Sequence, residues 1–228
     1  MFDTGATPSV LDPQLKEKLH LVTTAEPIAV LNGTVQGETA VVPTLQVGPI
    51  HRDNVSVSIQ DLSFLQKVLP VHIDGIVGLD VVGQNPFEVD YAAREIRFGP
   101  LPLMKDSVPF QWKEGLAVID AVVDQAQIHL LVDTGASSMI LFSARHQADT
   151  GSSAEPSSDT IGDFEQNHAQ SIRLSLGKTK FGHEAAFVVQ HHKDAVYDFD
   201  GLMSPAALGI TRVAVDPSRQ TIAFTREP

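Results

Sequence analysis

The tetrapeptide Asp-Thr-Gly-Ala occurs twice in the chain, at residues 3–6 and at residues 133–136. Each copy follows an apolar residue and is followed, within a few residues, by an apolar pair. Two carboxylates held close together cannot both ionise, so they share one proton. One can then act as a base toward a water molecule while the other acts as an acid toward a carbonyl. The duplicated motif therefore indicates paired acid–base chemistry by Asp3 and Asp133.

The repeat extends beyond the tetrapeptide. Several further residues recur 126 positions later in the chain; among them, Asp74, Gly83, Asp90 and Phe98 return as Asp200, Gly209, Asp216 and Phe224. A repeat of this length is typical of a duplicated domain, because solenoid repeats are much shorter. We expect an N-terminal lobe at residues 1–104 and a C-terminal lobe at residues 105–228, divided within the proline-containing segment 99–115.

Composition excludes several classes of function. The chain has 228 residues, which suits two domains of about 100 residues each. Its net charge is −12 with no basic stripe, so nucleic acid and anionic membranes are poor partners. No apolar run reaches the roughly 18 residues that a membrane span needs. There is no cysteine, which excludes disulfides, thiolate metal sites and a cysteine nucleophile.

Other residue clusters were weighed as sites. His191, His192 and Asp194, with His183 nearby, match no known metal-ligand spacing, and adjacent residues of a strand point to opposite faces. We interpret them as an exposed loop and expect no metal and no cofactor. The Ser137-Ser138 pair lacks the Gly-x-Ser-x-Gly turn that presents a serine nucleophile.

Turn signals every 8–12 residues between segments rich in β-branched residues predict a mostly β chain with a few short helices. Asp12 before Pro13 predicts a helix start, because Asp is a good N-cap and proline suits the first helical position. The expected strands cover residues 28–59, 87–91, 95–98, 118–132 and 172–189, the expected short helices cover 12–19 and 62–68 with another starting at Ser143, and the turns of the first region are marked by Asn32-Gly33, Gly37 and Gly48-Pro49.

The first Asp-Thr-Gly-Ala is followed about 70 residues later by Asp74-Gly75-Ile76-Val77-Gly78-Leu79. This pairing, present in each half, resembles the retropepsin-like and pepsin-like aspartic proteases, in particular the bacterial two-lobed single-chain type. The resemblance covers nearly the whole chain. It implies two retropepsin-like (acid-protease) β-barrel lobes related by a pseudo-two-fold axis. It also implies a monomer, an intramolecular pseudo-dimer, that hydrolyses peptide or protein substrates as an aspartic endopeptidase.

The resemblance also implies roles for individual residues. Asp3 and Asp133 would be the catalytic dyad, with no covalent intermediate. Thr4 and Thr134 would hydrogen-bond across the pseudo-two-fold axis, and Gly5 and Gly135 would let each loop turn tightly and offer an N–H to each carboxylate. Flaps over the substrate would lie near residues 32–37 and 162–167, with these substrate-binding candidates: Asn32, Gly33, Thr34, Asp163 and Phe164.

Three features depart from the family pattern. Asp3 lies only two residues after Met1, so we expect the N-terminal lobe to lack its first strands. No signal peptide is visible in the sequence as given, although a segment upstream of Met1 could contain one and would then place the protein outside the cytoplasm. Ser204 stands where the first half has Gly78. Ala6 and Ala136 stand where pepsin-like enzymes place a hydroxyl that would lower a carboxyl pKa, which predicts a working pH less acid than that of a stomach enzyme.

Two rival interpretations stay open at this point. The chain could be a catalytically inactive or truncated aspartic-protease-like module that binds peptides or regulates a partner. It could also be a structural β domain whose Asp-Thr-Gly segments only form turns, since Asp and Gly are both turn residues. A matched pair of carboxylates favours the enzyme, because neither rival needs it.

Overall fold

The computed structural model describes residues 1–228 except 31–32, 68, 103–105, 143–167, 190–197 and 227–228. Within these residues the chain is mostly β, as the sequence predicts. The elements of the first half are β1 (Val10–Leu11), α1 (Pro13–Lys18), β2 (Thr23–Val30), β3 (Gly33–Val47), β4 (Ile50–Ile59), the 3-10 helix η1 (Ser63–Lys67), β5 (Gly75–Ile76), α2 (Leu79–Val82), β6 (Phe87–Asp90) and β7 (Glu95–Phe98). Those of the second half are β8 (Val108–Lys113), β9 (Leu116–Val123), β10 (Ala126–Val132), β11 (Met139–Phe142), β12 (His168–Leu176), β13 (Thr179–Val189), β14 (Gly201–Met203), β15 (Arg212–Asp216) and β16 (Thr221–Thr225).

Most of the expected elements are present. Asp12 caps α1, because its carboxylate accepts a hydrogen bond from the Gln14 N–H at 2.9 Å. The hairpin β6–β7 and the strand pairs β9–β10 and β12–β13 lie where the sequence predicts them. One expectation was wrong: Gly37 lies inside the long strand β3, paired with Glu26, and makes no turn. The segment expected to divide the lobes contains a strand, β8, which pairs with both β9 and β16. The helix expected from Ser143 falls outside the described residues.

The sequence duplication reappears in the pairing of strands. In the first half, β1 lies parallel to β4 and antiparallel to β5, with Val10 opposite Ile76. In the second half, β11 lies parallel to β13 and antiparallel to β14, with Ile140 opposite Leu202. These partners are the residues that the sequence repeat aligns, so the two halves share one strand arrangement around their Asp-Thr-Gly-Ala segments.

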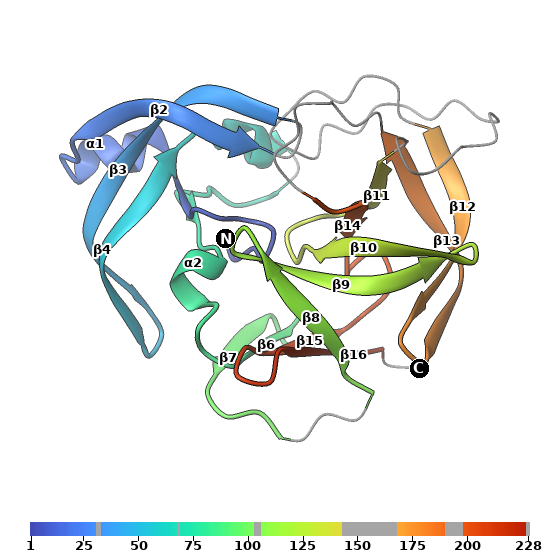
Figure 1. Ribbon diagram of the computed structural model, residues 1–228. Helices are drawn as coiled ribbons and strands as arrows, with labels where there is room; N and C mark the ends of the chain where they lie inside the picture. Colours follow the sequence, from blue (N-terminus) through green and yellow to red (C-terminus); the bar gives the residue numbers. More distant parts are fainter. Residues whose placement is uncertain (31–32, 68, 103–105, 143–167, 190–197, 227–228) are drawn as a thin grey trace.

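Two sheets contain all of these strands. One has the order β2-β3-β4-β1-β5, and the other has the order β10-β14-β11-β13-β12-β9-β8-β16-β15-β6-β7. The hairpin β6–β7 belongs to the first half by sequence but pairs with β15 of the second, with Phe87 opposite Val215. In Figure 1 the strands β2–β4 and β12–β13 flank the N-terminus on opposite sides, and β6, β7, β15 and β16 lie below it. A shared sheet thus joins the halves, and the division at residue 104 stays a prediction.

The largest cluster of buried apolar side chains contains residues of both halves. Phe87, Leu130, Val213 and Ile222 are fully buried in it, so residues from both sides of the expected boundary form one apolar cluster. Phe2, next to the first Asp, packs against this cluster with its ring edge-on to Phe87 at 5.4 Å. This packing fixes the start of the first Asp loop. In the part of the chain that the structure describes, no helix has the length and apolar character needed to cross a membrane.

Candidate active site

The backbone of each motif Asp is held by the same kind of hydrogen bond. The Asp3 N–H donates to the Val77 carbonyl at 3.0 Å, and the Asp133 N–H donates to the Met203 carbonyl at 3.0 Å. Before Asp3 the support is short: Phe2 forms a single parallel bridge with Val77. Before Asp133 it is long, because β10 pairs with β14 on one side and with β9 on the other. The two loops are therefore alike at the Asp but unequal in the strands that lead to it.

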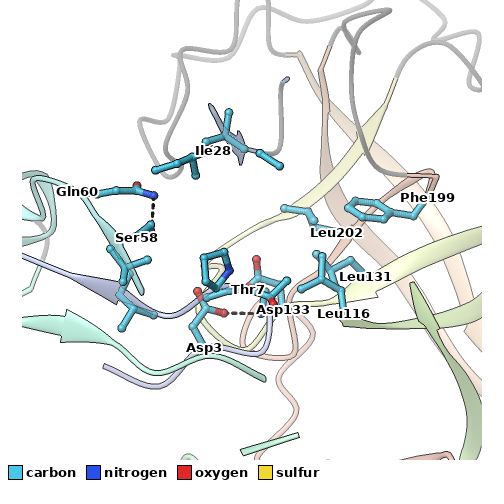
Figure 2. A pocket seen from close by; sticks show the side chains of 17 residues that line it. Asp3, Thr7, Ile28, Ser58, Gln60, Leu116, Leu131, Asp133, Phe199 and Leu202 are labelled. Carbon is cyan, nitrogen blue, oxygen red and sulfur yellow. Dashed lines mark hydrogen bonds between the residues drawn. The ribbon is translucent and has the colours of Figure 1, made fainter. Parts of the chain in front are cut away.

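The two carboxyl groups meet. Asp3 and Asp133 are hydrogen-bonded through their side chains, as the dashed line in Figure 2 shows. The Gly5 N–H donates to Asp3 Oδ1 at 2.7 Å, and the N–H groups of Gly135 and Ala136 donate to Asp133 Oδ1, each at 2.8 Å. These backbone donors orient both carboxyl groups without a side-chain hydroxyl at positions 6 and 136.

The environment of the pair favours a proton on one member. Burial raises the pKa of Asp133 well above its usual value of 3.8, and the negative charge of Asp3 and the hydrogen bond with it raise this pKa further. The two backbone N–H donors act in the opposite direction, because they stabilise the ionised form. The pair can therefore keep one shared proton at pH values above the usual aspartate pKa of 3.8.

The two motif threonines connect the loops. The Thr4 N–H donates to Thr134 Oγ1 and the Thr134 N–H donates to Thr4 Oγ1, both at 3.0 Å. The Thr4 hydroxyl in turn donates to the Val132 carbonyl at 2.6 Å. Thr4 is 1% exposed and Thr134 is 9% exposed, so these bonds are shielded from water. The bonds run between the loops and set their separation.

The motif glycines leave room for the carboxyl group of the other loop. A Cβ added at Gly5 would lie 2.5 Å from Asp133 Oδ2, and one added at Gly135 would lie 2.5 Å from Asp3 Oδ2. Real Cβ atoms do not approach other atoms so closely. Each glycine is therefore needed for the opposite Asp to reach the centre, a reason that the tight turn alone does not supply.

Ser204 and Gly78 support their loops in different ways. In the first half, the Leu79 N–H donates to the Ala6 carbonyl at 3.1 Å, and a Cβ at Gly78 would lie 2.2 Å from that carbonyl oxygen. In the second half, the Ser204 hydroxyl donates to the Ala136 carbonyl at 2.6 Å. Pro205, the equivalent of Leu79, has no backbone N–H to donate, so the Ser204 hydroxyl takes the place of that donor and the Asp133 loop keeps its support.

Tyr91 was not singled out from the sequence. It follows β6, and its hydroxyl donates to the Thr134 carbonyl at 3.2 Å. Burial and the negative charges of Asp133 and Asp3 raise the pKa of this hydroxyl, so it stays a donor. The resemblance to known proteases directed attention to the motif loops, whereas Tyr91 reaches them only because the β6–β7 hairpin joins the sheet of the second half.

A pocket opens above the two carboxyl groups. Figure 2 shows Ser58 and Gln60 on one side of the pair, Leu116, Leu131, Leu202 and Phe199 on the other, and Ile28 across the pocket. Further lining residues are Gly5, Ala6, Thr7, Pro8, Val10, Ala29, Val30 and Ile76. Both halves contribute walls, with the aspartates between them. The lining is mainly apolar, so few groups besides Asp3 and Asp133 can do chemistry there.

The first predicted flap corresponds to the hairpin β2–β3. Gly33 and Thr34 lie at the start of β3, opposite Val30 and Ala29 of β2. On this hairpin the pocket is lined by Ile28, Ala29 and Val30, which the sequence did not single out as binding residues. Asn32, Asp163 and Phe164, and the histidines weighed as metal ligands at positions 191 and 192, lie outside the described residues.

Comparisons with known proteins find similarity to aspartic proteases. Residues 1–81 match a family model described as aspartyl protease. A search of the curated proteins found no match. Among solved structures, the aspartic proteinase from Irpex lacteus is similar over 99% of this chain and 88% of its own, with 12% identity and a TM-score of 0.56. A retropepsin-like aspartic protease from Rickettsia conorii covers 54% of this chain and 97% of its own, with 16% identity and a TM-score of 0.39.

The Irpex lacteus similarity extends over both halves and therefore bears on the whole fold. It confirms the predicted fold class, a mostly β chain with the architecture of the acid proteases. The family match contains the first Asp-Thr-Gly-Ala and ends before the second. Both findings agree with the resemblance that the sequence motifs carry: the family model matches the first 81 residues, and the solved structure shows the fold.

Proposed function

We propose that this chain, whose first 81 residues match the aspartyl protease family and whose fold is that of the aspartic proteases, is an endopeptidase in which Asp3 and Asp133 activate water. The family and fold support a protease-like function acting on peptides. The single observation that carries the finer proposal is the hydrogen-bonded pair of carboxyl groups at the base of the pocket, with the pKa of Asp133 raised by burial and by Asp3.

The proposed reaction uses the shared proton. Asp133 carries it, and Asp3 accepts a proton from a water molecule as that water attacks the carbonyl carbon of the substrate. Asp133 gives its proton to the carbonyl oxygen, so the intermediate is a neutral diol. When the C–N bond breaks, Asp3 protonates the leaving nitrogen and Asp133 regains a proton from the diol. Both carboxyl groups return to their starting state, and no covalent intermediate forms.

The substrate would be an extended peptide lying between the hairpin β2–β3 and the two aspartates. An extended peptide can form main-chain hydrogen bonds with neighbouring strands while alternate side chains enter pockets. Ile28, Ala29 and Val30 place the hairpin against the same pocket as the aspartates. Because both carboxyl groups come from one chain, a monomer would suffice as an intramolecular pseudo-dimer.

A direct test compares Asp133→Asn with the wild-type protein on a broad peptide mixture. The variant keeps the shape of the side chain but cannot carry or release the shared proton, so cleavage should fall by at least about a thousandfold. Asp53→Asn is the matched control, since Asp53 is exposed on β4 and does not line the pocket, so it should leave cleavage unchanged. Cleavage by Asp133→Asn at the wild-type rate would overturn the proposal.

A second readout is the binding of statine-type peptides, in which a tetrahedral carbon bearing a hydroxyl group mimics the diol intermediate. A competent pair should bind them more tightly than the matching ground-state peptides. Equal binding of both, without cleavage of the natural peptide, would indicate a chain that binds peptides and does not turn them over.

A further inference from the structure

We propose that the pocket is chemically divided, and that Gln60 selects a substrate side chain carrying a neutral hydrogen-bond donor on the first-half side of the scissile bond. This inference rests on the proposed function, because it assigns a specificity to the same site. It concerns a residue outside the duplicated motifs, since Gln60 directly follows β4.

The side-chain amide of Gln60 forms a hydrogen bond through its nitrogen but, among the described residues, none through its oxygen. Its Nε2 donates to Ser58 Oγ at 3.1 Å, and its backbone N–H donates to the Leu11 carbonyl at 3.0 Å. Its Oε1 is buried, and among the described residues this oxygen has no hydrogen-bond partner. Buried acceptors are nearly always satisfied, because leaving one unpaired is costly. Gln60 lines the pocket, so a small shift of its amide as a peptide binds would expose Oε1 to a donor of the peptide that satisfies it.

The second half has no such group at the equivalent place. In the parallel pair β1–β4, Ser58 lies opposite Val10, and in the parallel pair β11–β13, Phe187 lies opposite Ile140. Val10 and Ile140 are equivalent in the repeat. Ser58 therefore corresponds to Phe187, and two residues further along each strand Gln60 corresponds to Val189. The duplication has kept the strands and exchanged a polar pair for an apolar pair.

The other walls sharpen this contrast. On the second-half side the pocket is lined by Leu116, Leu131, Phe199 and Leu202 (Figure 2), which offer an apolar surface. On the first-half side the walls around Ser58 and Gln60 are Val10, Ile28 and Ile76. A charged side chain would lose its hydration there without a carboxylate dedicated to it. The best match is a hydroxyl or amide side chain on this side and an aliphatic or aromatic one on the other.

The test measures binding separately from cleavage. Peptides carry a non-hydrolysable hydroxyethylene group in place of the scissile bond, and each flanking position is varied in turn among threonine, O-methylthreonine and valine. Threonine and valine are similar in shape but only threonine donates a hydrogen bond, whereas O-methylthreonine is larger by one methyl group and can only accept. At one position on one side, the wild-type protein should bind the threonine peptide about tenfold more tightly than the other two, as expected for one satisfied buried acceptor. On the opposite side valine should bind at least as well as threonine.

Variants of Gln60 assign the effect. Gln60→Leu and the unbranched Gln60→Met should both remove the preference for threonine while valine peptides bind as before. Gln46→Leu is the matched control and should keep the preference, because Gln46 is on β3 outside the pocket and its side chain donates to the Gly48 carbonyl. Thermal unfolding of each variant shows that it is folded, and the Met variant serves if the Leu variant is not.

Several results would overturn the inference. Threonine and valine peptides could bind equally at every position, or none of the peptides could bind. The preference could persist in both Gln60 variants. O-methylthreonine could bind like threonine, which would show that Gln60 donates through Nε2 after rotation of its amide. All peptides could weaken equally in the variants, which would place Gln60 against the peptide backbone. Binding with the expected preference but no cleavage of the natural peptide would instead count against the endopeptidase alone.

Discussion

The hydroxyl groups of Thr4 and Thr134 each accept a hydrogen bond from the other threonine's backbone N–H, at 3.0 Å in both directions. The two residues are 130 positions apart, and their bonds connect the loops that carry Asp3 and Asp133. This exchange fixes the distance between the loops, and with it the contact between the two carboxyl groups.

The first prediction concerns this exchange. Thr4→Val keeps the shape of the side chain but removes the acceptor for Thr134 and the donor to the Val132 carbonyl. It should lower the free energy of unfolding by about 2–4 kcal/mol, because buried groups are left unpaired. Thr134→Val should cost less, about 1–3 kcal/mol. It removes the acceptor for the Thr4 N–H but leaves the bond from the Thr4 hydroxyl to the Val132 carbonyl in place. Urea denaturation measures both values.

The matched control for the threonines is Thr44→Val, whose hydroxyl donates to Asp53 at an exposed position. Its effect should stay within about 0.5 kcal/mol. If Thr4→Val were as mild as this control, the bonds between the loops would contribute little to stability.

The second prediction concerns Gly5 and Gly135. Gly5→Ala and Gly135→Ala would each place a Cβ 2.5 Å from an oxygen of the opposite Asp, so the carboxyl groups must separate. Cleavage should fall by about a hundredfold or more, because small displacements at a reacting centre are costly. Gly182→Ala is the control, since a Cβ there meets nothing within 4 Å, and its kcat/KM should match the wild-type value. Wild-type cleavage by Gly5→Ala would contradict the close approach.

The third prediction concerns the unequal supports of the two loops. Ser204→Ala removes the hydroxyl that donates to the Ala136 carbonyl and accepts from the Ala207 N–H, and should cost about 1–3 kcal/mol of unfolding free energy. Gly78→Ala should cost more, because its Cβ would meet the Ala6 carbonyl oxygen at 2.2 Å. Denaturation curves of the two variants test the order. The opposite order would mean that the loop of the first half shifts to accommodate a Cβ at position 78 at little cost.

The fourth prediction concerns pH. The pKa of Asp133 is raised above its usual value of 3.8 by burial and by Asp3, so between that value and the folded-state pKa the folded chain binds more protons than the unfolded chain. The free energy of unfolding then falls as pH rises through this window, and this destabilisation is absent below the unfolded-state value. Asp133→Asn removes the titrating group, so its stability relative to wild type should increase from about pH 4 upward. Denaturation at several pH values measures the difference.

The slope of that difference is the informative quantity. A constant offset between wild type and Asp133→Asn would reflect altered hydrogen bonding, whereas a growing difference reflects the proton. Parallel stability curves from pH 3 to pH 7 would show that burial does not raise this pKa. Asp61→Asn serves as a control of opposite sign: hydrogen bonds with Ser63 lower the pKa of the exposed Asp61 carboxyl, so below about pH 4 this variant should lose stability relative to wild type as pH rises.

Local sequence determined much of this protein. Helix caps and turns depend on residues that are neighbours in the chain, so the sequence alone predicts them. The duplicated motif and the aligned residues of the two halves are likewise visible in the sequence. Asp12 before Pro13 predicted α1, and the β-branched segments predicted β9 and β10. The motif also identified Asp3 and Asp133, which the structure brings together.

Position in space decided the rest. Gly37 signals a turn locally but continues β3, because pairing with β2 outweighs its preference. Tyr91 approaches the Asp loops through a sheet shared by both halves, and Ser204 takes over the support that Leu79 gives in the first half. Nothing in the local sequence distinguishes Gln60 from other polar residues at the ends of strands.

Only the register of β1 against β4 puts Ser58 and Gln60 beside the pocket, where the second half has apolar residues. The sequence determined which carboxyl groups could pair, because a motif carries its own chemistry. The tertiary structure decided what surrounds them, because burial and partner atoms come from residues that are far apart along the chain.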